Sequence, residues 1–196
     1  MAAHNLAAVE RTGAVRLVTG CPGCYMTLKK TYPSRGFALK CEVLHTSELV
    51  ANLFDRGKLD FVRSPFGVRK SGATEGNAVA YHDPCVLGRK CGSFEPPRKL
   101  LESLPGVGRP LEFVENRAGS ACCGGGGPLG AIHEEMCVSI GQKRMAGAME
   151  MGARTVVSAC PACRVNLGDA ARALRARDEK VKFEVRDLVE LVARAI

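Results

Sequence analysis

The chain has 196 residues, 46% of them hydrophobic and 24% charged, so it can bury a core as one domain or as two small ones. It contains no apolar stretch near the roughly 20 residues of a membrane span and no signal-peptide layout at its N-terminus. Its net charge of +8 comes from scattered basic residues without interleaved aromatics, which argues against a nucleic-acid partner. We expect a cytoplasmic protein, with peripheral attachment to a membrane complex left open.

The beginning of the chain is repeated near its end at an offset of 139 residues. Cys21-Pro22 aligns with Cys160-Pro161, and Cys24 aligns with Cys163. Each copy is expected to form a helix, a strand, a Cys-Pro-x-Cys loop, a helix, a strand and a helix. The pattern places strands at residues 15–18 and 155–157 and helices at residues 47–54 and 187–196. Cys41 aligns with Phe183, which predicts a small apolar core residue.

The first copy is incomplete, because Met1 already aligns with Ile140. Glycine-rich residues 57–76 mark the expected boundary between the copies. We therefore predict three parts, in which residues 1–57 are the C-terminal half of a first unit, 58–76 are a linker, and 77–196 are a complete unit.

Within the complete unit, the pattern predicts strands at residues 78–81 and 111–114 and helices at residues 97–104 and 129–151. The fold class is therefore α/β, with mostly parallel sheets flanked by helices. All three cysteine loops of this unit follow strands. They are expected to meet at the carboxyl edge of the sheet, where open α/β folds usually bind ligands.

Five of the ten cysteines share a symmetrical spacing. Cys122 and Cys123 lie midway between Cys85 and the Cys160/Cys163 pair, with 36 residues on each side. Five thiols arriving from three loops favour a soft, thiolate-binding metal centre, either an iron–sulfur cluster or a structural zinc site. Four glycines follow Cys123, and we expect Gly124 and Gly125 to let the backbone approach the cofactor closely.

Three stretches carry a family resemblance: Tyr81-His82-Asp83-Pro84-Cys85, Cys122-Cys123-Gly124-Gly125, and Cys160-Pro161-Ala162-Cys163. They resemble the cysteine-rich CCG domain, which recurs in the B-type and D-type polypeptides of heterodisulfide reductase and in the iron–sulfur subunit of glycolate oxidase. The resemblance covers nearly the whole chain. It implies two pseudo-repeated CCG-type units, the first lacking its first half.

The resemblance also implies a cofactor and its ligands. Carried over by position, Cys85, Cys122, Cys123, Cys160 and Cys163 would hold one 4Fe-4S cluster, which is non-cubane in the B-type polypeptide of heterodisulfide reductase. Cys21 and Cys24 would be the remnant of a second site.

The expected function is that of an iron–sulfur subunit of a heterodisulfide reductase-like complex, relaying electrons to a disulfide, a thiol or a similar acceptor. The alternatives are a zinc-stabilised binding or assembly module without redox activity and an electron-transfer subunit of a glycolate or lactate oxidase. The chain has no flavin or nucleotide motif, so we expect a flavin- or ferredoxin-type electron-donating subunit as partner. A further chain could supply the missing half of the first unit.

Other residues near these motifs have two interpretations each. His82 either donates a proton to a departing thiolate, as a catalytic residue, or fixes the Asp83-Pro84 turn by a hydrogen bond. Arg89 and Arg98 either hold an anionic substrate or carboxylate, or are simply solvated. Cys91 and Cys137 fall outside the family pattern and are interpreted as structural.

Overall fold

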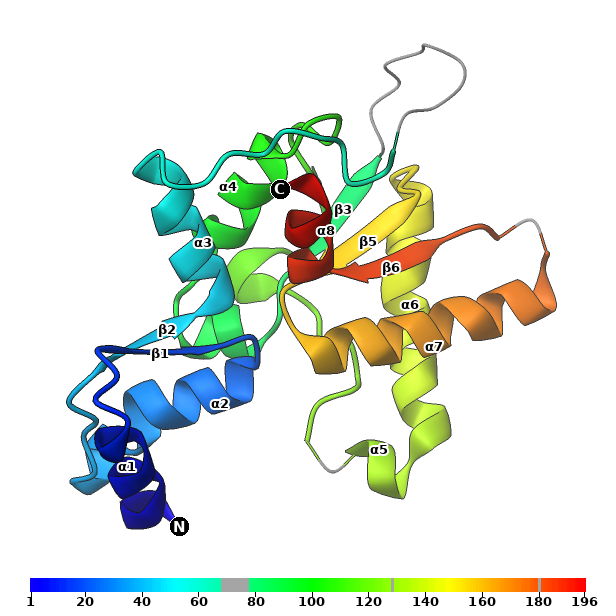
Figure 1. The fold of residues 1–196 in the computed structure, drawn as a ribbon. Coiled ribbons are helices and arrows are strands. Elements are labelled where there is room, and N and C mark those ends of the chain that lie inside the picture. Colours follow the sequence, from blue (N-terminus) through cyan, green and yellow to red (C-terminus); the bar gives the residue numbers. More distant parts are fainter. Residues whose placement is uncertain (68–77, 128, 180) are drawn as a thin grey trace.

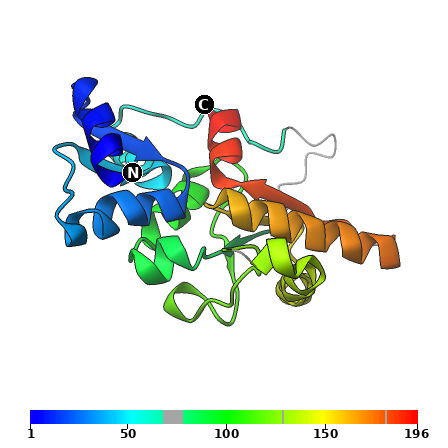
Figure 2. The same ribbon diagram turned by 90° about the horizontal axis from the view of Figure 1, so that it is seen from below.

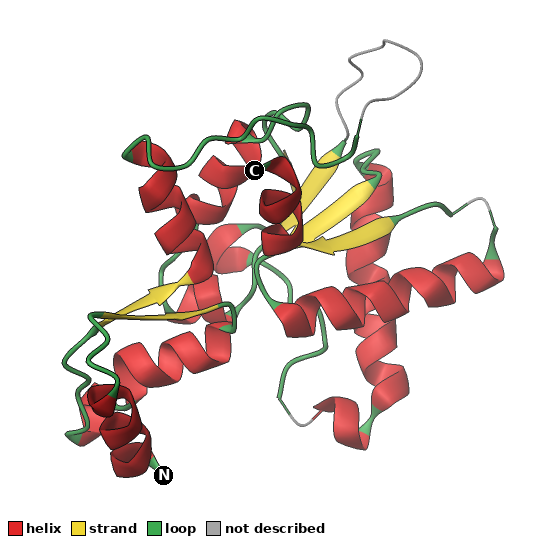
Figure 3. Cartoon of the chain, viewed as in Figure 1, coloured by secondary structure: helices red, strands yellow, loops and turns green. Residues whose placement is uncertain are grey.

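The computed structural model describes residues 1–67, 78–127, 129–179 and 181–196 (Figure 1). Helices and parallel strands alternate along the chain, as Figure 3 shows. The first segment contains α1 (Ala2–Arg11), β1 (Arg16–Thr19), α2 (Pro22–Met26), the single turns η1 (Thr27–Thr31) and η2 (Pro33–Arg35), β2 (Glu42–His45) and α3 (Thr46–Asp55). The rest contains β3 (Val79–His82), η3 (Val86–Lys90), α4 (Glu95–Ser103), β4 (Leu111–Glu112), η4 (Arg117–Gly119), α5 (Leu129–Ile132), α6 (Glu134–Glu150), β5 (Thr155–Ser158), α7 (Pro161–Arg177), β6 (Glu184–Asp187) and α8 (Leu188–Ala195).

The strands form two parallel sheets, which confirms the predicted α/β class. β1 pairs with β2, and the larger sheet has the order β4-β3-β5-β6. After β3 the chain crosses to β4 on one side and later to β5 on the other. The strand order therefore reverses between β3 and β5, and the crevice at the carboxyl ends of such a strand pair is the usual ligand site of open α/β sheets.

Alternation along β3 and β5 distributes side chains to two hydrophobic clusters, one on each face of the larger sheet. Tyr81 and Val157 belong to the cluster that includes residues of α3, α4 and α8. Ala80 and Val156 belong to the other cluster, with residues of α6 and α7. His82 lies two residues beyond Ala80, so the period of two directs it to the side of α6 and α7.

The predicted internal repeat is present in the structure. α1, β1, α2, β2 and α3 follow the same order as α6, β5, α7, β6 and α8. Gly13 and Gly152, which align in sequence, follow the first helix of each copy with φ angles of 66° and 72°. This left-handed conformation is unfavourable for residues with a Cβ atom, so the same residue type terminates the helix in both copies.

The first segment packs against the rest of the chain. Its residues Tyr25, Val43 and Ala51 belong to the same hydrophobic cluster as Tyr81 and Leu191. α3 contacts α4, and α2 contacts η3. Figure 2 shows the first segment on one side of the molecule and α6 and α7 on the other.

The described part of the expected linker, residues 58–67, is anchored to both sides. Phe61 stacks on Phe54 with ring centroids 5.1 Å apart, and Val62 N donates to Ala195 O. Residues 68–77 lie outside the described residues, as does the predicted start of the second unit at Asn77. The division at 58–76 stays a prediction.

Several predicted boundaries differ from the structure. The strand predicted at 111–114 ends at Glu112, and Phe113 O accepts a hydrogen bond from Asn116 Nδ2 in the turn that follows. The helix predicted at 129–151 is divided, because His133 has a non-helical φ of −140°. Cys41 is half-buried and belongs to neither described core cluster, so its prediction as a core residue was wrong. None of the helices in the described ranges is long and apolar enough to span a membrane.

Candidate metal centre

The three cysteine loops converge at the carboxyl edge of the larger sheet, as predicted. β3 leads into the turn that carries Cys85, and β5 leads into Cys160 and the start of α7. Cys122 and Cys123 reach the same edge on the loop after β4 and η4. The crevice between β3 and β5 is therefore flanked by cysteine-bearing loops.

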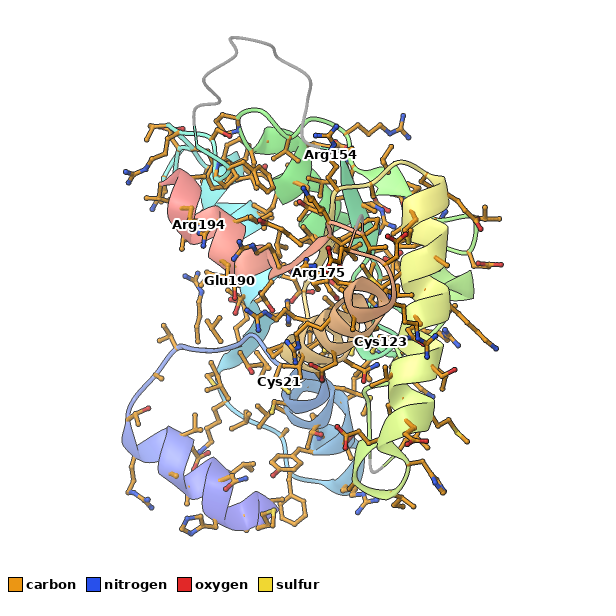
Figure 4. The ribbon with its side chains drawn as sticks, turned by 90° about the vertical axis from the view of Figure 1, so that its right-hand side faces the viewer. Cys21, Cys123, Arg154, Arg175, Glu190 and Arg194 are labelled. Atoms are coloured by element: carbon orange, nitrogen blue, oxygen red, sulfur yellow. The ribbon has the colours of Figure 1, made fainter. Side chains whose placement is uncertain are left out.

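Two buried sulfurs are in direct contact at the centre of this group. Cys123 Sγ and Cys163 Sγ lie 3.3 Å apart, and both side chains are almost fully buried. With a ring nitrogen of His82 they form a set of ligand atoms within 4.8 Å of one another. Figure 4 labels Cys123 beside α7. A thiophilic metal would find at least two thiolates and shielding from water here.

The sulfur protons are shared across the group. Hydrogen bonds, first from Cys122 and then from Cys163, hold the pKa of the Cys123 thiol far below its usual value. Hydrogen bonding to Cys123 is the first cause of raised pKa values at Cys122 and Cys163, with burial adding to both. The pKa of Cys160 is lowered to about 7, first by a hydrogen bond from Cys163. The four thiols therefore titrate as one system, in which a metal ion would replace the shared protons.

Cys85 and Cys122 form the more accessible side of the group. Cys85 is half-buried at the start of η3, and its charge acts on Cys122, which is exposed. A pocket of about 480 Å³ lies beside Cys122, with Phe113, Ile140 and Arg144 in its lining. The five thiols thus combine a buried pair with an approachable edge.

Backbone amides of the glycine loop point at two of the sulfurs. Gly124 N donates to Cys122 Sγ at 3.3 Å, and Gly125 N donates to Cys123 Sγ at 3.4 Å. Such N–H groups stabilise thiolates that bind a metal.

The reason for glycine at these two positions differs from the prediction. A Cβ at Gly124 would lie 2.7 Å from Cys137 O, and one at Gly125 would lie 2.4 Å from Asn166 Cβ. The missing side chains therefore make room for α6 and α7, not for a cofactor. The expectation that they open space for the ligand was wrong, although their amides serve the sulfurs.

This packing predicts a contrast between neighbouring glycines. Gly125→Ala should lower the free energy of unfolding of the metal-free protein by about 1–3 kcal/mol, because the added methyl group overpacks Asn166. Gly126→Ala is the matched control, since its Cβ would have nothing within 4 Å. Denaturant unfolding of both variants measures the contrast. Equal effects at the two positions would contradict the packing argument.

The loop that carries the double cysteine is fixed by side chains that the sequence did not single out. Asn166 Nδ2, buried on α7, donates to Cys123 O at 2.6 Å and to Cys137 O at 3.0 Å. Asn166 follows Cys163 by three residues, so helical spacing placed it on the same face of the predicted helix. That spacing was the available signal.

Asp83, between His82 and the Cys85 turn, ties three loops together. Its carboxylate accepts two hydrogen bonds of 2.8 Å from Arg98 and one of 2.8 Å from Arg117 N. Its carbonyl oxygen accepts from Ser120 Oγ. This supports a structural role for the Asp83-Pro84 turn.

Arg98 and Arg89 are engaged within the chain. Arg98 is 3% exposed, and its guanidinium also binds Glu112 at 2.6 and 2.8 Å. Arg89 donates to Ser120 O. The interpretation of Arg98 as an anion-binding residue was therefore wrong, because its donors already bind two internal carboxylates.

Cys21 and Cys24 do not join the described group of buried ligands. Cys21 Sγ accepts a hydrogen bond from Cys24 N at 3.3 Å and caps α2. A hydrogen bond with Cys21, followed by burial, raises the pKa of the Cys24 thiol. α2 contacts η3, so this loop lies beside the turn that carries Cys85. Figure 4 shows Cys21 at the start of α2.

The two cysteines outside the motif are placed as packing residues. Cys137 is 2% exposed. Cys91 is partly buried against the cluster that contains Tyr25. Both positions agree with the structural interpretation.

The fold and the site define a thiolate-rich, α/β metal-binding protein. The cysteine-rich domain family (CCG) matches residues 1–29 and 79–168, more than half of the chain. The chain therefore belongs to this family.

Curated relatives carry names of iron–sulfur and reductase proteins. The chain is 34% identical to the D-type polypeptide of a dihydromethanophenazine:CoB–CoM heterodisulfide reductase from Methanosarcina barkeri, covering 100% of this chain and 44% of the relative. It is 32% identical to the probable iron-sulfur-binding oxidoreductase FadF of Bacillus subtilis, covering 100% of this chain and 26% of the relative. It is 35% identical to the B-type polypeptide of a fumarate reductase (CoM/CoB) from Methanothermobacter marburgensis, covering 91% and 32%. The chain thus spans less than half the length of each of these relatives.

Proposed function

We propose that this chain is an iron–sulfur subunit of a heterodisulfide reductase-like oxidoreductase complex. Cys85, Cys122, Cys123, Cys160 and Cys163 would hold a 4Fe-4S cluster, of cubane or non-cubane type. The observation that carries the proposal is the gathering of these thiols at the strand-order reversal, with two sulfurs 3.3 Å apart in a buried position. The names of the relatives support the same chemistry.

The donor set fits an iron–sulfur cluster. Clusters of this kind need cysteine thiolates, amide hydrogen bonds to sulfur and protection from water. The cysteines, the amides of Gly124 and Gly125, and the burial of Cys123 and Cys163 provide these three features. When bound, the cluster would supply one-electron transfer to an acceptor.

The protein's own residues hold and orient this chemistry. Asp83, through Arg98 and Ser120, keeps the Cys85 turn and the double-cysteine loop at a fixed separation. The pocket beside Cys122 offers an approach for a disulfide or thiol acceptor. A flavin- or ferredoxin-type subunit would deliver the electrons, because electron transfer needs a donor that this chain does not itself encode by any nucleotide motif.

Reduction of the reconstituted protein tests this function. Anaerobic protein loaded with iron and sulfide should accept electrons from a reduced flavoprotein or ferredoxin and return them to a disulfide acceptor, followed by visible absorption and electron paramagnetic resonance. Cys137→Ser protein, which keeps all five proposed ligands, is the control. A loaded centre that neither takes up nor releases electrons over the physiological range of potentials would refute an electron-transfer role.

The zinc-stabilised module is a second candidate, and one observation favours it. His82, Cys123 and Cys163 gather as one nitrogen and two sulfurs, which is a donor combination that zinc accepts. In that case the site would hold the loops together without redox chemistry. The protonation of His82 separates the two candidates.

An unpaired strand edge supports the proposal of a further partner. β5 pairs on both sides and is fully buried, whereas its repeat counterpart β1 pairs with β2 alone among the described strands. Val18 of β1 is 38% exposed. By the repeat, the absent neighbour would be a parallel strand from a segment that also carries a cysteine and a double cysteine, to complete a site with Cys21 and Cys24.

Hydrogen exchange tests this partner. Added to this chain, a polypeptide with the missing half should slow exchange of the outward-facing amides of β1, because they enter a strand ladder. The amides of β5, already paired on both sides, are the internal control. Unchanged exchange along β1 in a formed complex would contradict strand pairing there.

A further inference from the structure

His82 is completely buried between an arginine and the sulfur group. It lies at the carboxyl end of β3, and its Nδ1 is 3.2 Å from Arg144 Nε on α6. Its Nε2 is buried without a hydrogen-bond partner among the described residues. Since Arg144 occupies Nδ1, Nε2 is the nitrogen left to face the sulfurs of Cys123 and Cys163.

The arginine determines which nitrogen carries the proton. A guanidinium has donors only and stays charged in proteins, so Nδ1 must present its lone pair to Arg144. A neutral imidazole then carries its single proton on Nε2. Flipping the ring over would place a C–H group against the Arg144 donor and leave both nitrogens without this partner.

Arg144 is itself held in place. Its side chain is 4% exposed, and Nη2 donates to Glu115 O at 3.0 Å and to Ser120 Oγ at 3.2 Å. Its guanidinium carbon lies 3.5 Å from the centre of the Phe113 ring. Movement away from His82 would break these contacts and leave a buried cation with fewer partners, which is costly.

We infer that Arg144 locks His82 as the Nε2–H tautomer, so that His82 donates a hydrogen bond to the cysteine sulfurs and is not a metal ligand. A histidine that binds a metal offers a lone pair and usually donates its other N–H to a carboxylate or carbonyl oxygen. Here the other nitrogen meets a donor, which is the opposite arrangement. The metal centre would then have thiolate ligands without imidazole, and Arg144 is a positioning residue for His82.

The inference has a redox consequence that rests on the proposed function. Hydrogen bonds to cluster sulfurs raise the reduction potential, because they stabilise the more negative reduced state. Loss of the Arg144 donor should therefore lower the potential of an iron–sulfur centre. The tautomer itself is a property of the chain and can be tested without iron.

Nuclear magnetic resonance of protein labelled with ¹⁵N at histidine measures the tautomer. Long-range ¹H–¹⁵N correlation should show His82 protonated at Nε2 in both the metal-free and the zinc-loaded protein, with His82→Gln identifying its signals. Zinc serves here as a diamagnetic probe. A His82 ring protonated at Nδ1, or loss of the Nε2 proton on zinc loading, would overturn the inference.

Three variants separate the role of Arg144 from general packing. Arg144→Met should let His82 sample both tautomers, and Arg144→Lys should restore part of the preference through its own donor. Ser120→Ala removes one support of Arg144 but leaves its Nε, so the wild-type tautomer should persist. If Arg144→Met fails to fold, the wild-type and Ser120→Ala spectra still decide the tautomer. An unchanged tautomer in folded Arg144→Met would overturn the role of Arg144.

The redox arm distinguishes this inference from the proposed function. In iron-loaded protein, the midpoint potential should fall in Arg144→Met, stay near wild type in Ser120→Ala and lie between them in Arg144→Lys. If no iron centre can be loaded while the Nε2–H tautomer is observed, the proposed function fails and the tautomer assignment stands.

Discussion

Cys163→Ser should abolish stable binding of the metal centre, reducing bound metal to a small fraction of that in the wild type. Cys163 is 4% exposed, contacts Cys123 Sγ at 3.3 Å and hydrogen-bonds with Cys160. A serine hydroxyl is a poor replacement, because it is hard, shorter and rarely ionised. Metal analysis and the visible thiolate-to-metal absorption measure the loss.

Cys137→Ser is the matched control for that change. Cys137 is also buried, at 2% exposure, but its sulfur is absent from the group formed by His82, Cys123 and Cys163. Its replacement should cost about 1–3 kcal/mol of stability through burial of a hydroxyl and leave the metal content unchanged. Equal metal loss in both variants would mean that packing, and not ligation, explains the effect of Cys163→Ser.

Arg98→Met should lower the free energy of unfolding of the metal-free protein by about 3–5 kcal/mol, because it leaves the Asp83 carboxylate buried without its cationic partner. The side chains of Arg98 and Asp83 are 4% and 2% exposed. Denaturant unfolding measures the loss.

Arg16→Met is the corresponding surface control. Arg16 pairs with Glu42 at 3.1 Å, but both side chains are more than half exposed. Its replacement should change stability by about 0–1 kcal/mol, since water and salt screen such pairs. A loss from Arg98→Met as small as that from Arg16→Met would contradict a structural role for the buried ion pair.

The parts of the fold that local patterns specify were predictable from the sequence. The aligned glycines Gly13 and Gly152, together with the Cys-Pro-x-Cys loops, revealed two copies of one helix and strand order. The period of hydrophobic residues located the strands before the cysteine loops to within one or two residues. Because all these strands are parallel, their following loops meet at one edge, so convergence of the thiols was also predictable.

What depends on contacts between distant residues was not predictable. Arg98 was interpreted as a possible anion-binding residue because sequence alone does not show that Asp83 and Glu112 already bind it. The glycine run indicated a close approach, but only the packing of α6 and α7 shows which atoms approach. The contact between Arg144 and His82 joins residues 62 positions apart, and no local pattern reports it.

Metal analysis of anaerobically purified wild-type protein tests the central claim most directly. The proposal predicts iron and acid-labile sulfide in stoichiometric amounts, little zinc, a brown chromophore and a paramagnetic signal after one-electron oxidation or reduction. Cys163→Ser protein prepared in parallel should lack both metal and signal. Stoichiometric zinc with essentially no iron in the wild-type protein would contradict the redox function and leave a zinc-stabilised module in its place.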